Sequence, residues 1–407
     1  MSTIKTRKEN AMKVYADNAA TTKMSKAAIE TYVEYANEYF GNPSSLYQTG
    51  QVAKEKLEEA RSRVAAIINA EPREIIFTSG GSEADNQALL SAAEAGLKKG
   101  KKHIISSAFE HHAILHTLRK LEKNGFEVTL LPVHENGIVV PGEVEDAIRE
   151  DTCLVTIMTV NNEIGTIQPI EKIGEICKRH GVTFHTDAVQ AVGHLPIDVK
   201  AQNIDMLSAS AHKFHGPKGV GFLYVRKGLP ISNLIEGGAQ ERGKRAGTEN
   251  LAGIMAMVIA LEESKRCMNS VKEHLLPIRD YIINGLSEIP HSALNGDMKE
   301  RMYSNVNFSF EGIEGESILI LLDQKGISAS SGSACTSGSL DPSHVLLAIG
   351  RIHDVAHGSL RLSLCDDATY EEADYIIENV KEIVEHLRGF SPVWRDLQEG
   401  KRTYILK

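Results

Sequence analysis

The sequence predicts an α/β fold, with a large, doubly wound domain built on a mainly parallel sheet and a smaller α+β domain after it. Short β-rich runs alternate with helical patterns through the first two thirds of the chain. Most of these runs show little alternation of polar and apolar residues, which is typical of strands covered on both faces. Beyond about residue 266 the rhythm changes. We therefore expect a large domain at 18–266 and a small domain made of 1–17 and 267–407.

The predicted elements follow this division. Strands of the large domain are expected at 75–78, 103–106, 127–131, 154–160, 183–187, 206–209 and 220–225. In the small domain we expect a long helix ending near 288, strands at 305–310, 326–331 and 359–364, and a helix at 370–387. Several of the first strands run into polar or glycine-rich segments followed by helix-like stretches. In doubly wound folds, ligands gather at these carboxyl ends of the strands.

Composition excludes several classes of protein. The net charge of −9, with acidic and basic residues interspersed, argues against a nucleic-acid-binding surface. No apolar run reaches about 18 residues, so no membrane span is expected. The basic residues near the start precede no apolar segment, so no secretory signal is predicted. The five cysteines are far apart and odd in number, which favours a reducing cytoplasm and predicts no metal site.

The end of the predicted strand at 206–209 carries the most informative residues. Ser210, His212 and Lys213 follow it closely, and Asp187 ends the strand before it. Lysine can hold pyridoxal phosphate as a Schiff base, while hydroxyl and imidazole groups can reach its phosphate. A carboxylate can keep the pyridine nitrogen protonated, so that the ring withdraws electrons. The pattern therefore predicts amino-acid chemistry.

Other predicted strand ends carry groups that suit the same cofactor. Gly81 and Ser82 open a helix whose free N–H groups can bind a phosphate. His111 could lie on an aromatic ring and take part in proton transfer, and Asn162 offers an amide to a ring hydroxyl. Each has a simpler interpretation: a capped turn, a surface or core histidine, and ordinary turn chemistry. Their ordered recurrence with Asp187, Gln190 and Lys213 favours a cofactor site.

The small domain contains a second candidate for chemistry. Residues 330–339 are nearly all Ser, Gly, Thr or Ala around Cys335, so we expect a mobile loop whose thiolate is a nucleophile that travels between sites. The alternative is a small polar turn with an incidental thiol. Cys153 and Cys177 stand in apolar or helical surroundings and are expected to be buried.

Arg361 lies in the predicted strand at 359–364, on the face opposite two leucines. A guanidinium on a strand is suited to clamp a substrate carboxylate with two hydrogen bonds. A surface salt bridge is the alternative interpretation.

The motifs together resemble one family, the cysteine desulfurases of the nitrogen-fixation and iron–sulfur-cluster type. The resemblance spans about residues 14 to 390 and rests on ten motifs: DNAATT at 17–22, GNPSS at 41–45, EH at 110–111, VNNEIG at 160–165, DAVQ at 187–190, HK at 212–213, GPKG at 216–219, QERG at 240–243, RAGTEN at 245–250 and SGSAC at 331–335.

This resemblance implies a homodimer of pyridoxal phosphate fold-type I that converts L-cysteine to L-alanine and leaves the sulfur as a persulfide. It also implies the role of each residue by position. Lys213 holds the cofactor and moves protons, Asp187 pairs with the pyridinium, and His111 stacks on the ring. Asn162 and Gln190 address the phenolic oxygen, whereas the phosphate is bound at Gly81 and by Ser82, Ser210, His212 and, from the other subunit, Thr248. Arg361 and Asn162 hold the substrate carboxylate, and Cys335 takes the sulfur and carries it to an acceptor protein such as an iron–sulfur scaffold.

The chain departs from the family's pattern in three places. Tyr47 stands where histidine is usual, Gly81-Ser82 replaces Ala-Thr while keeping a hydroxyl, and Cys365 stands where glycine is usual. Two alternatives stay open: a selenocysteine lyase or another class V pyridoxal phosphate enzyme, and a sulfur carrier or scaffold that retains the fold without catalysis. The tail after Phe390, with Trp394 and Tyr404, either docks a partner or packs as a terminal segment.

Overall fold

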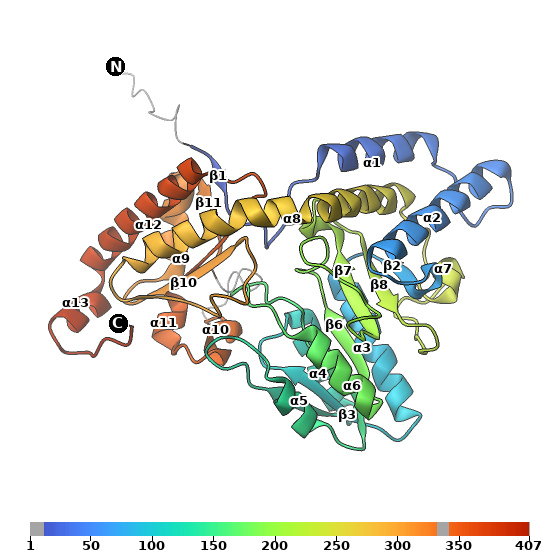
Figure 1. Cartoon of the computed structure of the whole chain (residues 1–407), viewed down its shortest axis with the longest axis horizontal. Helices are drawn as coiled ribbons and strands as arrows, with labels where there is room; N and C mark the ends of the chain where they lie inside the picture. Colours follow the sequence, from blue (N-terminus) through green and yellow to red (C-terminus); the bar gives the residue numbers. More distant parts are fainter. Residues whose placement is uncertain (1–11, 332–341, 407) are drawn as a thin grey trace. The chain divides into compact units, whose positions relative to one another are not determined.

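A seven-stranded sheet of order β2-β8-β7-β6-β5-β3-β4 forms the centre of the larger of two units in the computed structural model (Figure 1). The structure describes residues 12–331 and 342–406. The larger unit is Thr21–Asn162 with Thr166–Asn269, and the smaller is made of the described residues of 1–20, 163–165 and 270–407.

The sheet of the larger unit is parallel except at β8, which pairs antiparallel with both β2 and β7. The other neighbouring strands pair in parallel. The carboxyl ends of the other six strands therefore meet at one edge of the sheet. Because β8 runs the opposite way, its amino end lies at that edge. The strands are β2 (Ile75–Thr78), β3 (His103–Ser107), β4 (Glu127–Leu131), β5 (Thr152–Thr156), β6 (Thr183–Asp187), β7 (Met206–Ser210) and β8 (Gly221–Val225).

Helices cover this sheet and account for the missing polar alternation in its strands. Every residue of β2, β3, β5, β7 and β8 is buried, whereas the edge strand β4 is mostly accessible. Helix α3 packs against β5, β6, β7 and β8, and its alanines and leucine join one apolar core with residues of β3 and β5. The helices are α1 (Lys26–Glu38), α2 (Gln48–Ile67), α3 (Gly81–Leu97), α4 (His112–Lys123), α5 (Pro141–Ala147), α6 (Ile170–His180) and α7 (Gln240–Gly243), with short 3-10 turns η1 (Pro72–Glu74) and η2 (Ala211–Lys213).

The smaller unit has an antiparallel sheet of order β12-β10-β9 and a parallel pair, β1 with β11. Helix α8 (Leu251–Ser287) contributes residues to both units along one continuous helix. The remaining elements are β1 (Val14–Tyr15), β9 (Ser292–Leu294), β10 (Asn305–Phe310), β11 (Ile327–Ser328), β12 (Ser359–Ser363), α9 (Gly315–Gln324), α10 (His344–Ala348), α11 (His353–His357), α12 (Tyr370–Phe390) and α13 (Pro392–Gln398).

The predicted strands differ from the observed ones mainly at their ends. The strand expected at 154–160 is β5, which ends at Thr156, because the following buried residues bond to the end of β6 and to Ile167. The strand expected at 326–331 is reduced to the two residues of β11. Apolar composition reports burial, and burial continues beyond the regular ladder in both places.

The C-terminal tail packs on its own unit. Trp394 lies over the Arg388 guanidinium at 3.9 Å and edge-on to His291, which stacks on Tyr404 at 3.7 Å between ring centroids. Of the two interpretations of this segment, the structure supports terminal packing. No helix in the described part of the chain is long and apolar enough to cross a membrane.

A buried ion pair holds the segment after residue 240 against the sheet. The Arg61 guanidinium, on α2, donates to both Glu241 carboxylate oxygens at 2.6 and 2.8 Å and to the Ile75 carbonyl at 2.9 Å. Glu241 also accepts the Phe77 N–H at 3.0 Å, and both charged side chains are nearly inaccessible. Removing one partner would leave the other charge buried and uncompensated.

We therefore expect Glu241→Ala to lower the free energy of unfolding by about 3–5 kcal/mol, measured by urea denaturation. Glu127→Ala is the matched control, because Glu127 pairs with Arg149 at the surface of the same unit, where a salt bridge adds little. Equal stability of the two variants would contradict the importance of the buried pair.

Candidate active site

The carboxyl ends of β6 and β7 bring the central predicted residues together. Asp187 ends β6, Ser210 ends β7, and Lys213 closes the turn η2 directly after it. The Asp187 carboxylate accepts the Val189 N–H at 2.9 Å. Burial raises the pKa of Asp187 to about 6, while that hydrogen bond and the positive charge of Lys213 act in the opposite direction. The amine and the carboxylate are therefore close enough to interact electrostatically.

Hydrogen bonds from two other segments hold the turn that carries Lys213. The Lys213 carbonyl oxygen bonds to His194 Nε2 at 2.8 Å. The His212 carbonyl accepts both the N–H and the hydroxyl of Thr22, at 2.9 and 3.0 Å. Burial and two nearby lysines lower the pKa of His212 to about 4, so its imidazole is neutral at pH 7. The backbone is thus fixed while the lysine side chain stays half-accessible.

Glycines allow a helix N-terminus to approach Ser210 closely. Helix α3 begins at Gly81, and Gly80 before it has φ +151°, a conformation that favours glycine. At Gly221 a Cβ would lie 2.3 Å from the Ala209 carbonyl oxygen and 2.8 Å from the Gly80 Cα. A side chain at position 221 would not fit, so glycine lets β8 pack directly against the backbone of Gly80, at the start of α3. The free N–H groups of a 17-residue helix and the accessible Ser82 hydroxyl make an anion cradle.

His111 and Asn162 follow the ends of the adjacent strands β3 and β5. His111 caps α4, and its Nδ1 accepts the Ala113 N–H at 3.1 Å, which leaves Nε2 to carry the proton of the neutral ring. Gln190 lies in the turns after β6. These three residues are half-buried, and with Gly81, Ser82, Asp187, Ser210, His212 and Lys213 they line the carboxyl edge of the sheet in the larger unit.

Buried titratable groups lie behind this edge, and sequence reasoning missed them. Burial and the Asp187 charge raise the pKa of Asp85, on α3, and burial raises that of Glu110 to about 8. His185, in β6, bonds to the Thr156 and Ser208 hydroxyls at 2.9 and 3.0 Å, and burial lowers its pKa to about 3. Glu110 belongs to the EH motif at 110–111, and that motif is the sequence signal that could have pointed to it. Asp85 and His185 carry none, because their roles depend on burial.

Thr248 lies on the exposed segment that follows α7, near the carboxyl end of β2. With Thr78, Ser79 and Arg245 it lines a pocket of about 220 Å³. Arg245 in turn bonds to Glu83, in the first turn of α3, at 2.8 Å.

Arg361 belongs to the smaller unit, at the centre of β12. Its side chain is 2% exposed, and Nη2 donates to the Asp17 carboxylate at 2.7 Å. Its backbone exchanges two hydrogen bonds with Ser330, at 2.7 and 3.1 Å. The alternative of a surface salt bridge is therefore wrong, because the guanidinium is buried and oriented by a carboxylate.

Both neighbours of the cysteine loop are held in the smaller unit. Ser330 bonds to β12, and the Ser343 hydroxyl donates to the Glu163 carboxylate at 2.5 Å. Burial raises the pKa of Glu163 to about 7, against the charge of Arg361 and that hydrogen bond. Cys335 and the rest of 332–341 lie outside the described residues, so the mobile loop and the nucleophilic thiolate stay predictions.

The predicted burial of Cys153 and Cys177 is confirmed. Burial raises the pKa of their thiols to about 11 and about 12, so both are protonated at neutral pH. Cys365 is half-buried, and its pKa is raised to about 11, mainly by burial. These thiols are poor nucleophiles at neutral pH.

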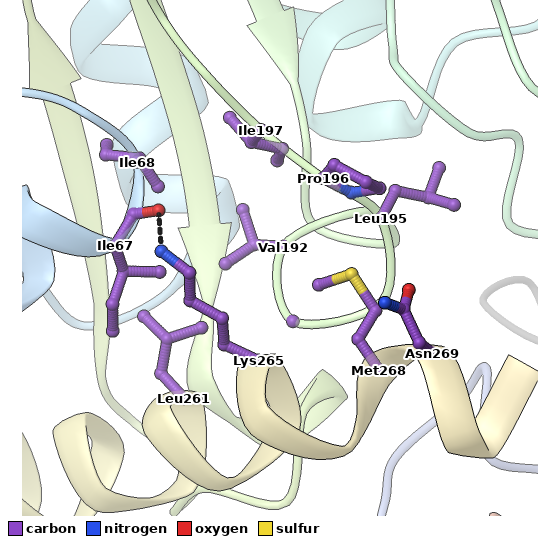
Figure 2. A pocket seen from close by; sticks show the side chains of 11 residues that line it. Ile67, Ile68, Val192, Leu195, Pro196, Ile197, Leu261, Lys265, Met268 and Asn269 are labelled. Atoms are coloured by element: carbon purple, nitrogen blue, oxygen red, sulfur yellow. Dashed lines mark hydrogen bonds between the residues drawn. The ribbon is translucent and has the colours of Figure 1, made fainter.

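A second pocket, of about 240 Å³, carries little chemistry (Figure 2). Its walls are largely aliphatic, from Ile68, Val192, Leu261 and their neighbours. Lys265 reaches along it and donates to the Ile67 carbonyl at 2.8 Å, at the end of α2. No acid, imidazole or thiol of the described residues lines it, so the candidate site lies at the strand ends instead.

Comparison with known proteins gives the family. The protein family described as "Aminotransferase class-V" matches residues 14–376 of the chain. The chain is 54% identical to "Cysteine desulfurase IscS" of Clostridium botulinum over 391 residues, which are 95% of this chain and 98% of that protein. Among solved structures, "NIFS-LIKE PROTEIN" matches with a TM-score of 0.87 and 38% identity, over 92% of this chain and 100% of that one. The structure "SspA in complex with cysteine" matches with a TM-score of 0.76 and 37% identity, over 86% of this chain and 98% of that one.

The chain therefore belongs to the class V aminotransferase family, and within it to the cysteine desulfurases of the NifS and IscS type. The predicted fold-type I architecture is confirmed with it. Enzymes of this family use pyridoxal 5'-phosphate. The described residues fit that cofactor, because they supply an amine, a buried carboxylate and a glycine-bounded helix N-terminus at one sheet edge.

We expect Gly221→Ala to weaken cofactor binding by about tenfold or more, since the added Cβ must push the Gly80 backbone away from its present position. Absorbance titration of the cofactor-free protein with pyridoxal phosphate measures this. Gly142→Ala is the control, because open space surrounds that glycine. Wild-type affinity in Gly221→Ala would show that the cradle does not depend on the close approach.

Asp187 predicts a pH-dependent effect on stability. Its pKa is raised on folding, so without cofactor its carboxylate destabilises the folded state, increasingly from about pH 4 and fully above about pH 6. Asp187→Asn should raise the free energy of unfolding of the cofactor-free protein at pH 7.5 by on the order of 1–3 kcal/mol, and by nothing near pH 3.5. Urea denaturation at the two pH values measures the difference, and an equal gain at both would contradict this cause.

Proposed function

We propose that this protein converts L-cysteine to L-alanine with pyridoxal phosphate and passes the sulfur to Cys335 as a persulfide. The observation that carries the proposal is the gathering of Lys213, Asp187 and His111 at one sheet edge, in a chain 54% identical to a protein named cysteine desulfurase. The solved relative "SspA in complex with cysteine" supports the same substrate.

Two residues would set the cofactor's chemistry. When bound, pyridoxal phosphate withdraws electrons from the bonds around the α-carbon of an amino acid. Lys213 is the proposed attachment point, and its amine then moves protons to and from the substrate. Asp187 would pair with the pyridine nitrogen. Its burial raises its pKa in the absence of a cation, which makes it a strong partner for one.

The phosphate would lie at the start of α3. The N–H groups there, beginning at Gly81, and the hydroxyls of Ser82 and Ser210 are the proposed donors. His212 is neutral, so it would contribute a single N–H donor and no charge. The accessible position of Thr248 is compatible with reaching the phosphate of a second subunit.

The remaining residues would orient the ring and the substrate. His111, oriented by the Ala113 N–H at its Nδ1, would stack on the ring, while Asn162 and Gln190 would hydrogen-bond the phenolic oxygen of the cofactor. Arg361, with help from Asn162, would hold the substrate carboxylate. The Asp17 contact supports that role, because it orients the buried guanidinium.

Sulfur transfer to Cys335 would need no external oxidant. The Cys335 thiolate attacks the substrate sulfur, an S–S bond forms, and the bond from sulfur to the substrate β-carbon breaks. Its electron pair stays with carbon and takes up a proton, so the products are L-alanine and a Cys335 persulfide. The persulfide can then pass its outer sulfur to an acceptor thiol.

We also propose a homodimer that works in the cytoplasm. On α1 and the segment after it, apolar side chains are exposed, among them Phe40 at 75% and Leu46 at 93%, as expected for a surface that a second copy covers. The cysteines of the described residues are free thiols, which supports a reducing compartment. An acceptor such as an iron–sulfur scaffold would receive the sulfur.

The direct test is incubation of the purified protein with L-cysteine and a thiol reductant, with alanine and sulfide measured together. Equal amounts of both support the proposal. Bound cofactor with neither product would overturn it in favour of another amino-acid substrate.

Cys335→Ala should abolish persulfide formation and sulfide release while cofactor stays bound, and Lys213→Ala should stop turnover. Cys365→Ala is the matched control, because its thiol is half-buried with a raised pKa and should leave sulfide release unchanged. Persulfide labelling with an alkylating probe and mass spectrometry locates the sulfur. Sulfide release by Cys335→Ala at the wild-type rate would refute the role of this thiol.

A further inference from the structure

Glu110 is a buried carboxyl next to a proposed catalytic residue, and none of the roles above uses it. Its side chain is fully buried, directly before His111. One oxygen, Oε1, accepts the Ser107 hydroxyl at 2.5 Å and the Met158 N–H at 3.0 Å. Ser107 ends β3, and Met158 lies two residues beyond β5. The carboxyl therefore ties the ends of two adjacent strands together.

A second hydrogen bond links the same two strand ends. The Asn161 side-chain amide donates to the Phe109 carbonyl at 3.1 Å, and both residues are buried. Each tie is next in the chain to a proposed cofactor contact: Glu110 precedes His111, and Asn161 precedes Asn162. Two bonds across one gap restrict the relative position of the two loops more than either could alone.

The charge environment of Glu110 favours its protonated form at neutral pH. Burial is the largest cause of its raised pKa, and the negative charge of Asp187 at the end of β6 adds to it. Burial also raises the pKa of Asp85, on α3, and the negative charges of Asp187 and Glu110 add to that rise. A protonated Glu110 still accepts both hydrogen bonds through Oε1. Asp187 is then the carboxylate that would pair with the pyridine nitrogen.

We propose that Glu110 is a positioning residue for the cofactor, which joins the ends of β3 and β5 so that His111 and Asn162 keep their places around the ring. This inference rests on the proposed function and deepens it. It predicts that the acceptor oxygen of Glu110 is needed, whereas its negative charge is not.

Three variants separate positioning from simple stability. Glu110→Ala removes the tie, and Glu110→Gln keeps a neutral acceptor of the same shape. Glu74→Ala is the matched control: Glu74 is also buried and also accepts two hydrogen bonds, in its case from the backbone N–H groups of Lys227 at 2.7 Å and Glu71 at 2.8 Å. Because Glu74 precedes β2, it lies at the opposite edge of the sheet from the candidate site.

The readouts are the absorbance spectrum of the bound cofactor from pH 6 to 10, kcat and KM for L-cysteine, and the thermal midpoint without cofactor. In Glu110→Ala we expect a displaced absorbance titration and a fall of about tenfold or more in kcat, with KM changed less. Glu110→Gln should restore the wild-type spectrum at pH 7, and should lack any step in the titration that ionisation of Glu110 causes near pH 8. Glu74→Ala should lower the thermal midpoint and leave the spectrum unchanged.

Two results would overturn the proposal: a wild-type spectrum and kcat in Glu110→Ala, or an equal spectral change in Glu74→Ala. If Glu110→Ala fails to fold, Ser107→Ala removes one of the two donors and should shift the spectrum in the same direction; a wild-type spectrum there counts against the proposal. Failure of the proposed function is separate. A wild-type protein that binds the cofactor and desulfurates nothing refutes that function, whereas the spectral comparison still tests Glu110.

Discussion

The larger unit depends on one constraint: charged groups must be held at the carboxyl edge of a sheet whose central strands are buried. Asp187 is buried at that edge, with the half-accessible Lys213 near it, and the carboxylate could not be buried there alone without a large desolvation cost. The glycine contact at Gly221 and the bonds from Thr22 and His194 hold the turns that carry these charges. Much of the sequence around the strand ends serves this arrangement.

The same constraint explains the buried polar groups behind the edge. His185 is neutral and satisfied by two hydroxyls, and Glu110 and Asp85 have raised pKa values. Asp187 is the carboxyl that ends a strand at this edge, where a cationic pyridine nitrogen would compensate its negative charge. A site prepared in this way destabilises the cofactor-free protein and gains most from binding, because binding supplies the missing positive charge.

The smaller unit solves a related problem for the buried guanidinium of Arg361. Arg361 lies in β12, with Asp17 as its carboxylate partner and Ser330 on its backbone. Glu163 and Ser343 hold the chain on the other side of 332–341. The residues flanking Cys335 are thus anchored by hydrogen bonds within one unit, and proposals about the thiol can be tested against these fixed points.

The sequence alone was sufficient to predict the α/β class, most strand positions and the family. Apolar runs report burial, and the motifs keep cofactor-binding residue types such as Lys213 and Asp187 at the strand ends. It predicted β8 but not its antiparallel direction, and it missed the two-residue strand β1, because strand direction and short pairings depend on distant partners. Only the tertiary structure showed that Arg361 is buried against Asp17 and that Glu110 joins β3 to β5. A side chain's pKa and hydrogen-bond partners depend on which residues folding brings around it, and residues 50 or more apart in the chain meet there only in the folded state.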